Sequence, residues 1–156
     1  MRQHHKRVKP VPDDCHSITP YLLVPDVGEL VGFLKKAFGG VEKAKITRPN
    51  GTVLHAQVRI GDSLVMIGEP QAPWKPRPSM LYLYVVDVDA TYRRAVKVGA
   101  KAVVEPVDMF YGDRHACVKD VAENDWWIAT RIENVSLDEI QKRATAFFKE
   151  MAKPAA

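Results

Sequence analysis

The feature that most constrains the fold is an internal duplication. A shift of 61 positions aligns residues 21–27 with residues 82–88, and five of these seven pairs are identical. Without a gap, the same shift aligns three further identical pairs: Lys36 with Lys97, Gly51 with Gly112, and Ile67 with Ile128. Two copies of one structural unit are therefore predicted.

The first copy contains five successive patterns. Residues 18–24 form a short apolar run that predicts a buried strand, and the helix after it ends at Gly39-Gly40. The apolar residues of this helix recur on one face: Leu30, Phe33, Leu34, Ala37 and Phe38. Turns at 48–51 and 61–62 separate two more strands, 54–60 and 63–68. The predicted order is strand, helix, strand, strand, strand.

The second copy repeats this order. Asp87 or Asp89 is expected to cap a helix that ends at Gly99, and residues 111–113 replace the Asn-Gly turn of the first copy. Residues 125–132 are predicted to form the last strand. Before that strand we expect a turn, with Asn124 as the residue that tolerates a left-handed backbone.

The chain is long enough for one domain of the α+β class. We predict a flexible basic leader at 1–16 and a single domain at 17–135, with module one at 17–69 and module two at 79–135. The hinge at 70–78 contains four prolines, which exclude a helix or a central strand. A capping box at Ser136 opens a final helix, 136–151, whose apolar face covers its own sheet or docks on a second subunit.

The charge distribution argues against nucleic-acid binding. The chain has 23 Lys and Arg against 19 Asp and Glu, but four of the bases precede the first acid, Asp13, so the remaining chain is balanced. No apolar run approaches a signal sequence or a membrane span. Cys15 and Cys117 stand alone, so we expect a cytoplasmic protein without disulfides, in which Cys117 is a buried apolar residue.

Three groups of motifs resemble the vicinal oxygen chelate superfamily, and within it the PhnB-like branch of the glyoxalase/bleomycin resistance proteins. They are the strand openings at 19–24 and 82–90, the helix end at 33–39, and the later segments 54–62, 108–114 and 126–130. The resemblance covers about residues 17–145. It implies two tandem βαβββ modules that form an open curved sheet around a cavity, often in a homodimer. The superfamily includes lyases, isomerases, dioxygenases and metal-free drug-binding proteins, so the fold does not fix the reaction.

The enzymes of this superfamily hold one divalent metal with His and Glu side chains on the first and last strands of each module. The corresponding positions here are occupied by Thr19, Met66, Met80 and Trp127. None of these side chains suits a hard dication. We therefore expect no cofactor, with a divalent metal as the alternative.

Several side chains near the same positions predict a ligand pocket. Tyr21, Leu64, Met66 and Trp127 would give it apolar and aromatic walls, although plain core packing is the alternative. Tyr111, Asp113 and Arg114 would add polar groups near a turn at the edge of the cleft. Arg114 either clamps a ligand carboxylate or pairs with Asp113 or Asp120.

His55 is a weak candidate for a catalytic or metal-binding residue, because it lies on the polar face of a predicted strand. Its possible partner is His115. The 61-residue shift, however, pairs His55 with Ala116, so the two imidazoles are expected on opposite sides of equivalent strands unless a bulge intervenes.

These features predict a protein that binds a small apolar or aromatic molecule in the cavity between its modules, without a metal. One alternative is a metal-dependent, glyoxalase-like lyase, isomerase or dioxygenase. Another is a structural or interaction protein whose cavity is filled by its own side chains.

Overall fold

The computed structural model describes residues 8–153, and the chain divides into two compact units between Pro78 and Ser79. The division falls at the end of the predicted hinge. Within residues 8–153, no helix is both long and apolar enough to cross a membrane.

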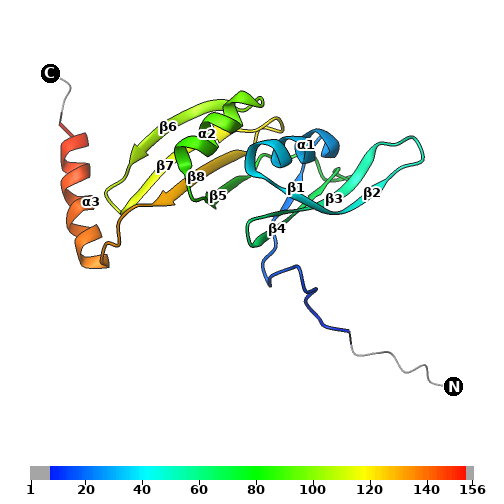
Figure 1. Cartoon of the computed structure of the whole chain (residues 1–156), viewed down its shortest axis with the longest axis horizontal. Helices are drawn as coiled ribbons and strands as arrows, with labels where there is room; N and C mark the ends of the chain where they lie inside the picture. The colour runs from blue at the N-terminus through cyan, green and yellow to red at the C-terminus, as the bar shows by residue number, and fades with distance from the viewer. Residues whose placement is uncertain (1–7, 154–156) are drawn as a thin grey trace. The chain divides into compact units, whose positions relative to one another are not determined.

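The first unit is a four-stranded sheet with one helix against it (Figure 1). Its strand order is β1-β4-β3-β2; β1 runs parallel to β4, and the other neighbours are antiparallel. The elements in chain order are β1 (Tyr21–Leu23), α1 (Val27–Phe38), β2 (Val41–Thr47), β3 (Val53–Ile60) and β4 (Ser63–Gly68). The predicted order is confirmed, but β1 begins at Tyr21 and not at residue 18.

Helix α1 begins and ends where its local sequence dictates. The Asp26 side chain accepts a hydrogen bond from the Glu29 backbone N–H at 2.9 Å, and Gly39 ends the helix with a left-handed backbone at φ 67°. Its predicted apolar face is buried against the sheet, with Leu30, Leu34 and Ala37 fully enclosed. The other face of the sheet is therefore the one left for function.

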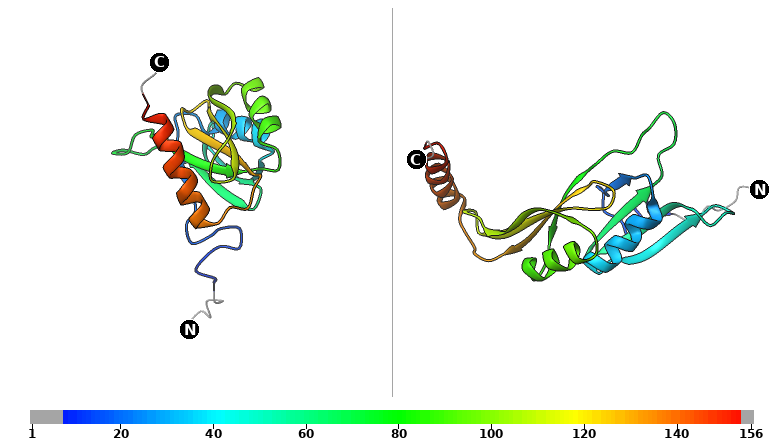
Figure 2. Two further views of the ribbon diagram at one scale, coloured as in Figure 1. Left: turned by 90° about the vertical axis from the view of Figure 1, so that its left-hand side faces the viewer. Right: turned by 90° about the horizontal axis from the view of Figure 1, so that it is seen from above.

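The second unit repeats the architecture with strand order β5-β8-β7-β6, and Figure 2 shows its helix, in green, against one face of the sheet. Its elements in chain order are β5 (Met80–Tyr84), α2 (Val88–Lys97), β6 (Lys101–Asp108), β7 (Asp113–Lys119) and β8 (Asp125–Arg131). Asp87 is the residue that caps α2, by accepting from the Ala90 N–H at 2.9 Å. The two modules are thus α+β units of the same topology, as the duplication predicts.

The register shows that the 61-residue shift holds for the first and last strands of each module. Tyr21 lies opposite Met66, and Tyr82 lies opposite Trp127. The shift fails for the third strand. Ala56 faces Ile67, but Ala116 faces Ile128, so β7 is displaced by 60 positions from β3. The connection before β7 is one residue shorter than its counterpart, and the turn after β7 is one residue longer.

The longer turn is organised around Asp120, which is buried. Its carboxylate accepts hydrogen bonds from the Asn124 backbone, the Asn124 amide and the Trp126 indole, at 3.0, 2.9 and 2.8 Å. The left-handed residue is Glu123, with φ 67°, and not Asn124 as expected. The Asn124 side chain is instead used in the turn, where its Oδ1 also accepts from the Ser79 N–H at 2.9 Å.

Helix α3 (Leu137–Met151) does not cover the sheet. Ser136 caps it as predicted, but none of its residues is buried, and within the described residues it packs against no strand. The expectation that it covers its own sheet is wrong. Phe147 touches Phe110, with ring centroids 5.2 Å apart, and Arg143 pairs with Glu133. Leu137, Phe148 and Met151 are exposed, whereas Ile140 and Ala144 are half-buried.

The predicted leader is described only in part, because residues 1–7 lie outside the described residues. In the described part, the Asp14 carboxylate forms an ion pair with Arg59 on β3. The Cys15 N–H donates to the Pro12 carbonyl at 3.0 Å. The flexibility of the leader stays a prediction.

Candidate functional site

In each sheet, most of the candidate functional side chains lie on the face opposite the helix. Side chains alternate along a strand, so the registers assign each residue to one face. In the first unit this open face holds Tyr21 and Leu23 on β1, His55, Gln57 and Arg59 on β3, and Leu64, Met66 and Gly68 on β4. In the second unit it holds Tyr82 and Tyr84 on β5, Asp113, His115 and Cys117 on β7, and Trp127, Ala129 and Arg131 on β8.

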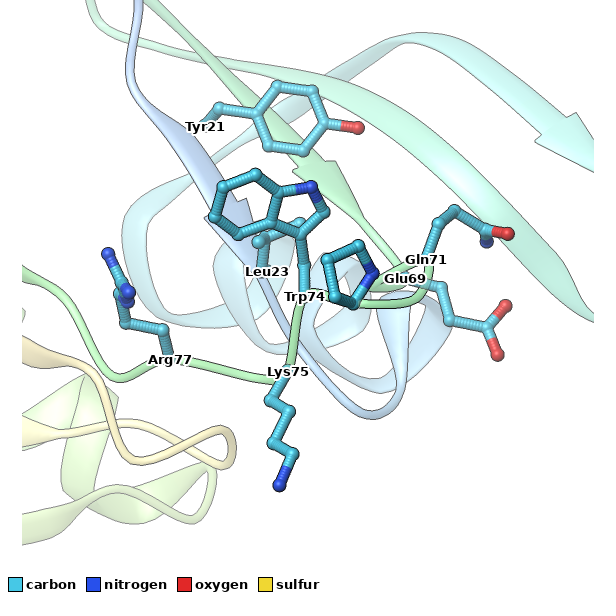
Figure 3. Close-up of a pocket in the computed structure, with 8 residues that line it drawn as sticks. Tyr21, Leu23, Glu69, Gln71, Trp74, Lys75 and Arg77 are labelled. Atoms are coloured by element: carbon cyan, nitrogen blue, oxygen red, sulfur yellow. The ribbon is translucent and has the colours of Figure 1, made fainter.

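The first unit contains a pocket of about 670 Å³ between β1 and the proline-rich segment that follows β4. We call it the Trp74 pocket. It is lined by Tyr21, Leu23, Glu69, Gln71, Pro73, Trp74, Lys75 and Arg77. Figure 3 shows the Trp74 indole beside the Tyr21 ring, with Leu23 behind it and the Lys75 side chain directed away. Two aromatic rings and an aliphatic side chain therefore form one wall.

The proline-rich segment is attached to β1 by its backbone. The Arg77 N–H donates to the Leu23 carbonyl at 3.1 Å, and the Trp74 N–H donates to the Gln71 carbonyl at 2.9 Å. The first bond ties the segment to β1 just after Trp74, and the second closes a turn within the segment just before it. The indole is nevertheless 64% exposed, which is a large apolar surface to leave in water.

Tyr21 also borders a second hollow, of about 350 Å³, which His55, Leu54 and an ion pair between Arg48 and Glu69 help to line. The Tyr21 hydroxyl and the His55 Nδ1 are hydrogen-bonded at 3.2 Å. This contact requires Gly68, because a methyl group there would overlap the Tyr21 ring and hydroxyl. Gly68 thus lets Tyr21 cross β4 and reach β3.

The second unit carries a polar group on its open face that we call the tyrosine–aspartate cluster: Tyr82, Tyr84, Tyr111, Asp113 and His115. The Tyr84 hydroxyl donates to Asp113 Oδ2 at 2.8 Å, and the Tyr82 hydroxyl donates to the same oxygen at 3.4 Å. The Tyr111 hydroxyl and His115 Nδ1 are 2.9 Å apart. Asp113 and His115 are both buried.

Burial and the Asp113 carboxylate determine the ionisation of this cluster. The hydrogen bond to Asp113 raises the pKa of Tyr84, and burial is the main reason that the pKa of Tyr82 is raised. Burial also lowers the pKa of His115, although the nearby Asp113 opposes the shift. Tyr82 and Tyr84 are therefore neutral hydroxyl donors at neutral pH, and a neutral His115 is favoured.

The two histidines occupy equivalent places, contrary to the expectation from the 61-residue shift. His55 lies opposite Gly68 and His115 lies opposite Ala129, and these two partners are 61 positions apart. The one-residue displacement of β7 returns His115 to the open face of its sheet. The expected placement on opposite sides is therefore wrong.

Of the other predicted ligand residues, some line a pocket and others do not. Tyr21 lines the Trp74 pocket, and Tyr111 lines a pocket of the second unit. Leu64, 2% exposed, is buried, and Met66 lies opposite Tyr21 without lining the pocket. Trp127 packs beside the His115 ring, with centroids 4.8 Å apart.

Arg114 lies on the face of its sheet that α2 covers. Its guanidinium donates two hydrogen bonds to Asp89 on α2, at 2.7 and 2.9 Å, and a third to Asp108 at 2.8 Å. The structural alternative is the one observed, but the partners are not Asp113 or Asp120.

The residues that the resemblance places at the metal positions of the superfamily do not fit a divalent cation. Thr19 precedes β1 and Met80 is the first residue of β5, whereas Met66 on β4 and Trp127 on β8 lie opposite Tyr21 and Tyr82. Hydroxyl, thioether and indole groups are poor ligands for such an ion. Among residues 8–153, no group of three or more His, Cys, Asp and Glu side chains is arranged to hold a metal.

Sequence reasoning missed Trp74 and Tyr84 as site residues. The prolines around Trp74 predict a hinge, although a large aromatic residue among four prolines is also a sign of a surface pocket. Asp113 is expected only as one of the polar groups near the cleft. Nothing in the local sequence shows that two tyrosines of β5 converge on it.

The fold and the two sites define a class: tandem βαβββ modules with pockets of small-molecule size at their open sheet faces. A family model described as Glyoxalase/Bleomycin resistance protein/Dioxygenase superfamily matches residues 16–128. The chain belongs to this superfamily. The model does not separate the PhnB-like branch, which stays a prediction.

Relatives and solved structures agree with this family. The chain is similar to the uncharacterized protein Mb0911c of Mycobacterium bovis, at 32% identity over 136 residues, which are 80% of this chain and 90% of that protein. It resembles the structure of TioX from Micromonospora sp. ML1, with TM-score 0.66, 23% identity, and coverage of 75% of this chain and 99% of TioX. It also resembles the fosfomycin resistance protein FosX of Listeria monocytogenes, with TM-score 0.56, 15% identity, and coverage of 80% and 97%. At these identities the two structures support the fold alone.

Proposed function

We propose that this chain binds a small apolar or aromatic molecule in the Trp74 pocket, and that it does so without a metal. The observation that carries the proposal is the exposed Trp74 indole, held by a backbone-anchored loop beside Tyr21 and Leu23 (Figure 3). A ligand between these side chains would remove their apolar surface from water. The pocket volume of about 670 Å³ suits a drug-sized molecule.

The polar groups of the Trp74 pocket lie at its edge. Glu69 is held by Arg48, while the Gln71 amide and the Arg77 guanidinium remain on the pocket wall. Such an arrangement lets a few hydrogen bonds orient a mostly apolar ligand. The fosfomycin resistance protein among the structural neighbours is named for a small molecule, which supports a ligand-binding role for the fold.

The neutral fluorescent probe N-phenyl-1-naphthylamine tests this proposal. Its emission should rise when it enters the pocket, and Trp74→Ala should weaken its binding about tenfold or more, because one aromatic wall is lost. Val41→Ala is the control: Val41 is an exposed apolar residue of the same unit, 57% against 64% for Trp74, and it lies outside the Trp74 pocket. Equal affinity of wild type and Trp74→Ala would contradict the proposal.

Chelation and metal analysis test the metal-free part. The probe should bind equally well before and after treatment with EDTA, since the residues at the superfamily's metal positions do not suit a cation. One nickel, zinc, manganese or iron ion per chain that is lost in His55→Ala would favour the glyoxalase-like lyase, isomerase or dioxygenase. Absence of binding by any aromatic compound would favour a structural or interaction role.

We also propose a homodimer that uses the apolar face of α3. Leu137, Phe148 and Met151 are 83%, 61% and 68% exposed, which is unusual for a helix with a well-defined apolar face. Phe148→Glu is expected to shift the protein from dimer to monomer in sedimentation velocity experiments, whereas Lys149→Glu is not. A wild-type monomer would contradict the proposal.

A cytoplasmic location is the remaining part of the proposal. Cys15 and Cys117 are both free thiols, which is typical of proteins in reducing compartments. Fractionation of cells that produce the full chain, with detection by an antibody, measures its location.

A further inference from the structure

The second unit contains a pocket of about 530 Å³ that the proposed function does not use. It is lined by Tyr84, Tyr111, Asp113, Arg131 and Ile140, and none of these residues lines the Trp74 pocket. It combines two aromatic rings, an aliphatic side chain of α3 and two opposite charges. We call it the Asp113 pocket.

Asp113 has an unused hydrogen-bond acceptor. Its side chain is only 6% exposed, and both tyrosine hydroxyls that reach it donate to Oδ2. Within the described part of the chain, no hydrogen bond reaches Oδ1 and no base lies within ion-pair distance of the carboxylate. Oδ1 is therefore an open acceptor on the pocket wall, and a cationic N–H donor of a ligand would form a charge-assisted hydrogen bond with it.

Arg131 supplies the opposite charge. It lies directly across from Asp113 in the β7–β8 register, so the two side chains share a face. They do not pair, because Nε and Nη2 of Arg131 donate to the Glu133 carbonyl at 3.4 Å and to Asn134 Oδ1 at 2.9 Å. Among the described residues, nothing is hydrogen-bonded to Nη1, and no carboxylate pairs with this guanidinium. The pocket therefore offers one open anionic acceptor and one open cationic donor, side by side.

From this juxtaposition we propose that the Asp113 pocket binds a small aromatic zwitterion of the α-amino acid type. Its ammonium group is held by Asp113 Oδ1 against the rings of Tyr84 and Tyr111, and its carboxylate is held by Arg131 Nη1. An amino acid carries these charges close together, as neighbouring cross-strand side chains require. Its aromatic side chain lies against the tyrosine rings and Ile140.

This inference can be tested with L-phenylalanine and two analogues, L-phenylalaninamide and N-acetyl-L-phenylalanine, each of which lacks one of its two charged groups. The amide lacks the carboxylate, and the acetylated compound lacks the ammonium group. We expect L-phenylalanine to bind about tenfold more tightly than either analogue, measured by chemical-shift titration of the backbone amides near Asp113 and Arg131. Equal affinities for the three probes, or no shifts near these residues, would overturn the inference.

Variants give the same test from the protein side. Asp113→Asn should weaken the binding of L-phenylalanine and of the amide about tenfold and leave the binding of the acetylated probe unchanged. Arg131→Gln should weaken the binding of L-phenylalanine and of the acetylated probe and leave the binding of the amide unchanged. Lys101→Gln, a charge removal on β6 outside the pocket, is the control. Arg131 is exposed, so its variant stays informative even where Asp113→Asn unfolds. A uniform loss for all three probes in both variants would overturn the inference.

The two binding proposals can be tested separately, because each predicts a different response to the same variants. Trp74→Ala should leave L-phenylalanine binding unchanged, because Trp74 does not line the Asp113 pocket. Arg131→Gln should likewise leave N-phenyl-1-naphthylamine binding unchanged. Loss of both ligands in Trp74→Ala would overturn the assignment of the zwitterion to the Asp113 pocket.

Discussion

His55 and His115 occupy the same register position in their two sheets, yet their rings are held by tyrosines of different origin. His55 is bonded by Tyr21 from the first strand of its module, whereas His115 is bonded by Tyr111 from the connection before β7. The difference lies in the residue opposite each histidine, Gly68 in one sheet and Ala129 in the other. An alanine Cβ takes up the space that the Tyr21 ring uses above Gly68, so Tyr82 turns to Asp113 instead.

Gly68→Ala is expected to displace Tyr21 and to break its hydrogen bond to His55. Since Tyr21 lines the Trp74 pocket, the affinity for N-phenyl-1-naphthylamine should fall severalfold, and the nitrogen-15 resonances of the His55 ring should shift. The control is Gly32→Ala in α1, where an added Cβ meets nothing within 4 Å and should stabilise the helix by about 0.5–1 kcal/mol. Unchanged His55 resonances in Gly68→Ala would contradict the role of this glycine.

His115→Gln should reduce the loss of stability in mild acid. Burial lowers the pKa of His115 in the folded state below its ordinary value of about 6.5, so protons bind the unfolded chain preferentially. The contribution of neutral His115 to the free energy of unfolding is therefore fully present above its unfolded pKa. This contribution is lost as the pH falls from the unfolded pKa toward the folded pKa. Urea titrations between about pH 7.5 and 5 should show a smaller decrease for His115→Gln than for wild type. The less buried His55 provides the control variant, His55→Gln, and equal decreases in wild type and His115→Gln would argue against this role.

Cys117 should resist alkylation under conditions that label Cys15. Burial raises the pKa of the Cys117 thiol to about 11, and the residue is almost fully enclosed opposite Trp127. At about pH 8 its thiolate is scarce, and iodoacetamide reacts with thiolates. Mass spectrometry should find one label per folded chain, and none in Cys15→Ser until the protein is unfolded. Labelling of both cysteines at one rate would contradict the enclosed site.

Asp120→Ala should be strongly destabilising, by about 2–4 kcal/mol in the free energy of unfolding measured with urea. The change leaves the Asn124 amide and the Trp126 indole N–H without their acceptor in a buried turn. Asp62→Ala provides the comparison, since Asp62 lies in the corresponding but exposed turn of the first module and should cost far less. Similar losses for the two variants would show that the hydrogen bonds of Asp120 contribute little.

The sequence by itself determined the duplication, the order of elements in each module and the helix caps. These properties depend on residues close together in the chain, such as Asp26 with Glu29 and Ser136 with Glu139, and on hydrophobic periods that local geometry imposes. Such properties can be predicted from the sequence wherever the local pattern agrees with the fold around it.

Only the tertiary structure decided which side chains meet on the open faces. Two compensating changes of one residue, before and after β7, leave the overall shift at 61 but reverse the face of every side chain on that strand. As a result His115 and Asp113 lie beside Tyr82 and Tyr84, while Arg114 faces α2. Loop lengths set strand register, and register brings together residues from strands that are distant in the sequence, so no local pattern could place them.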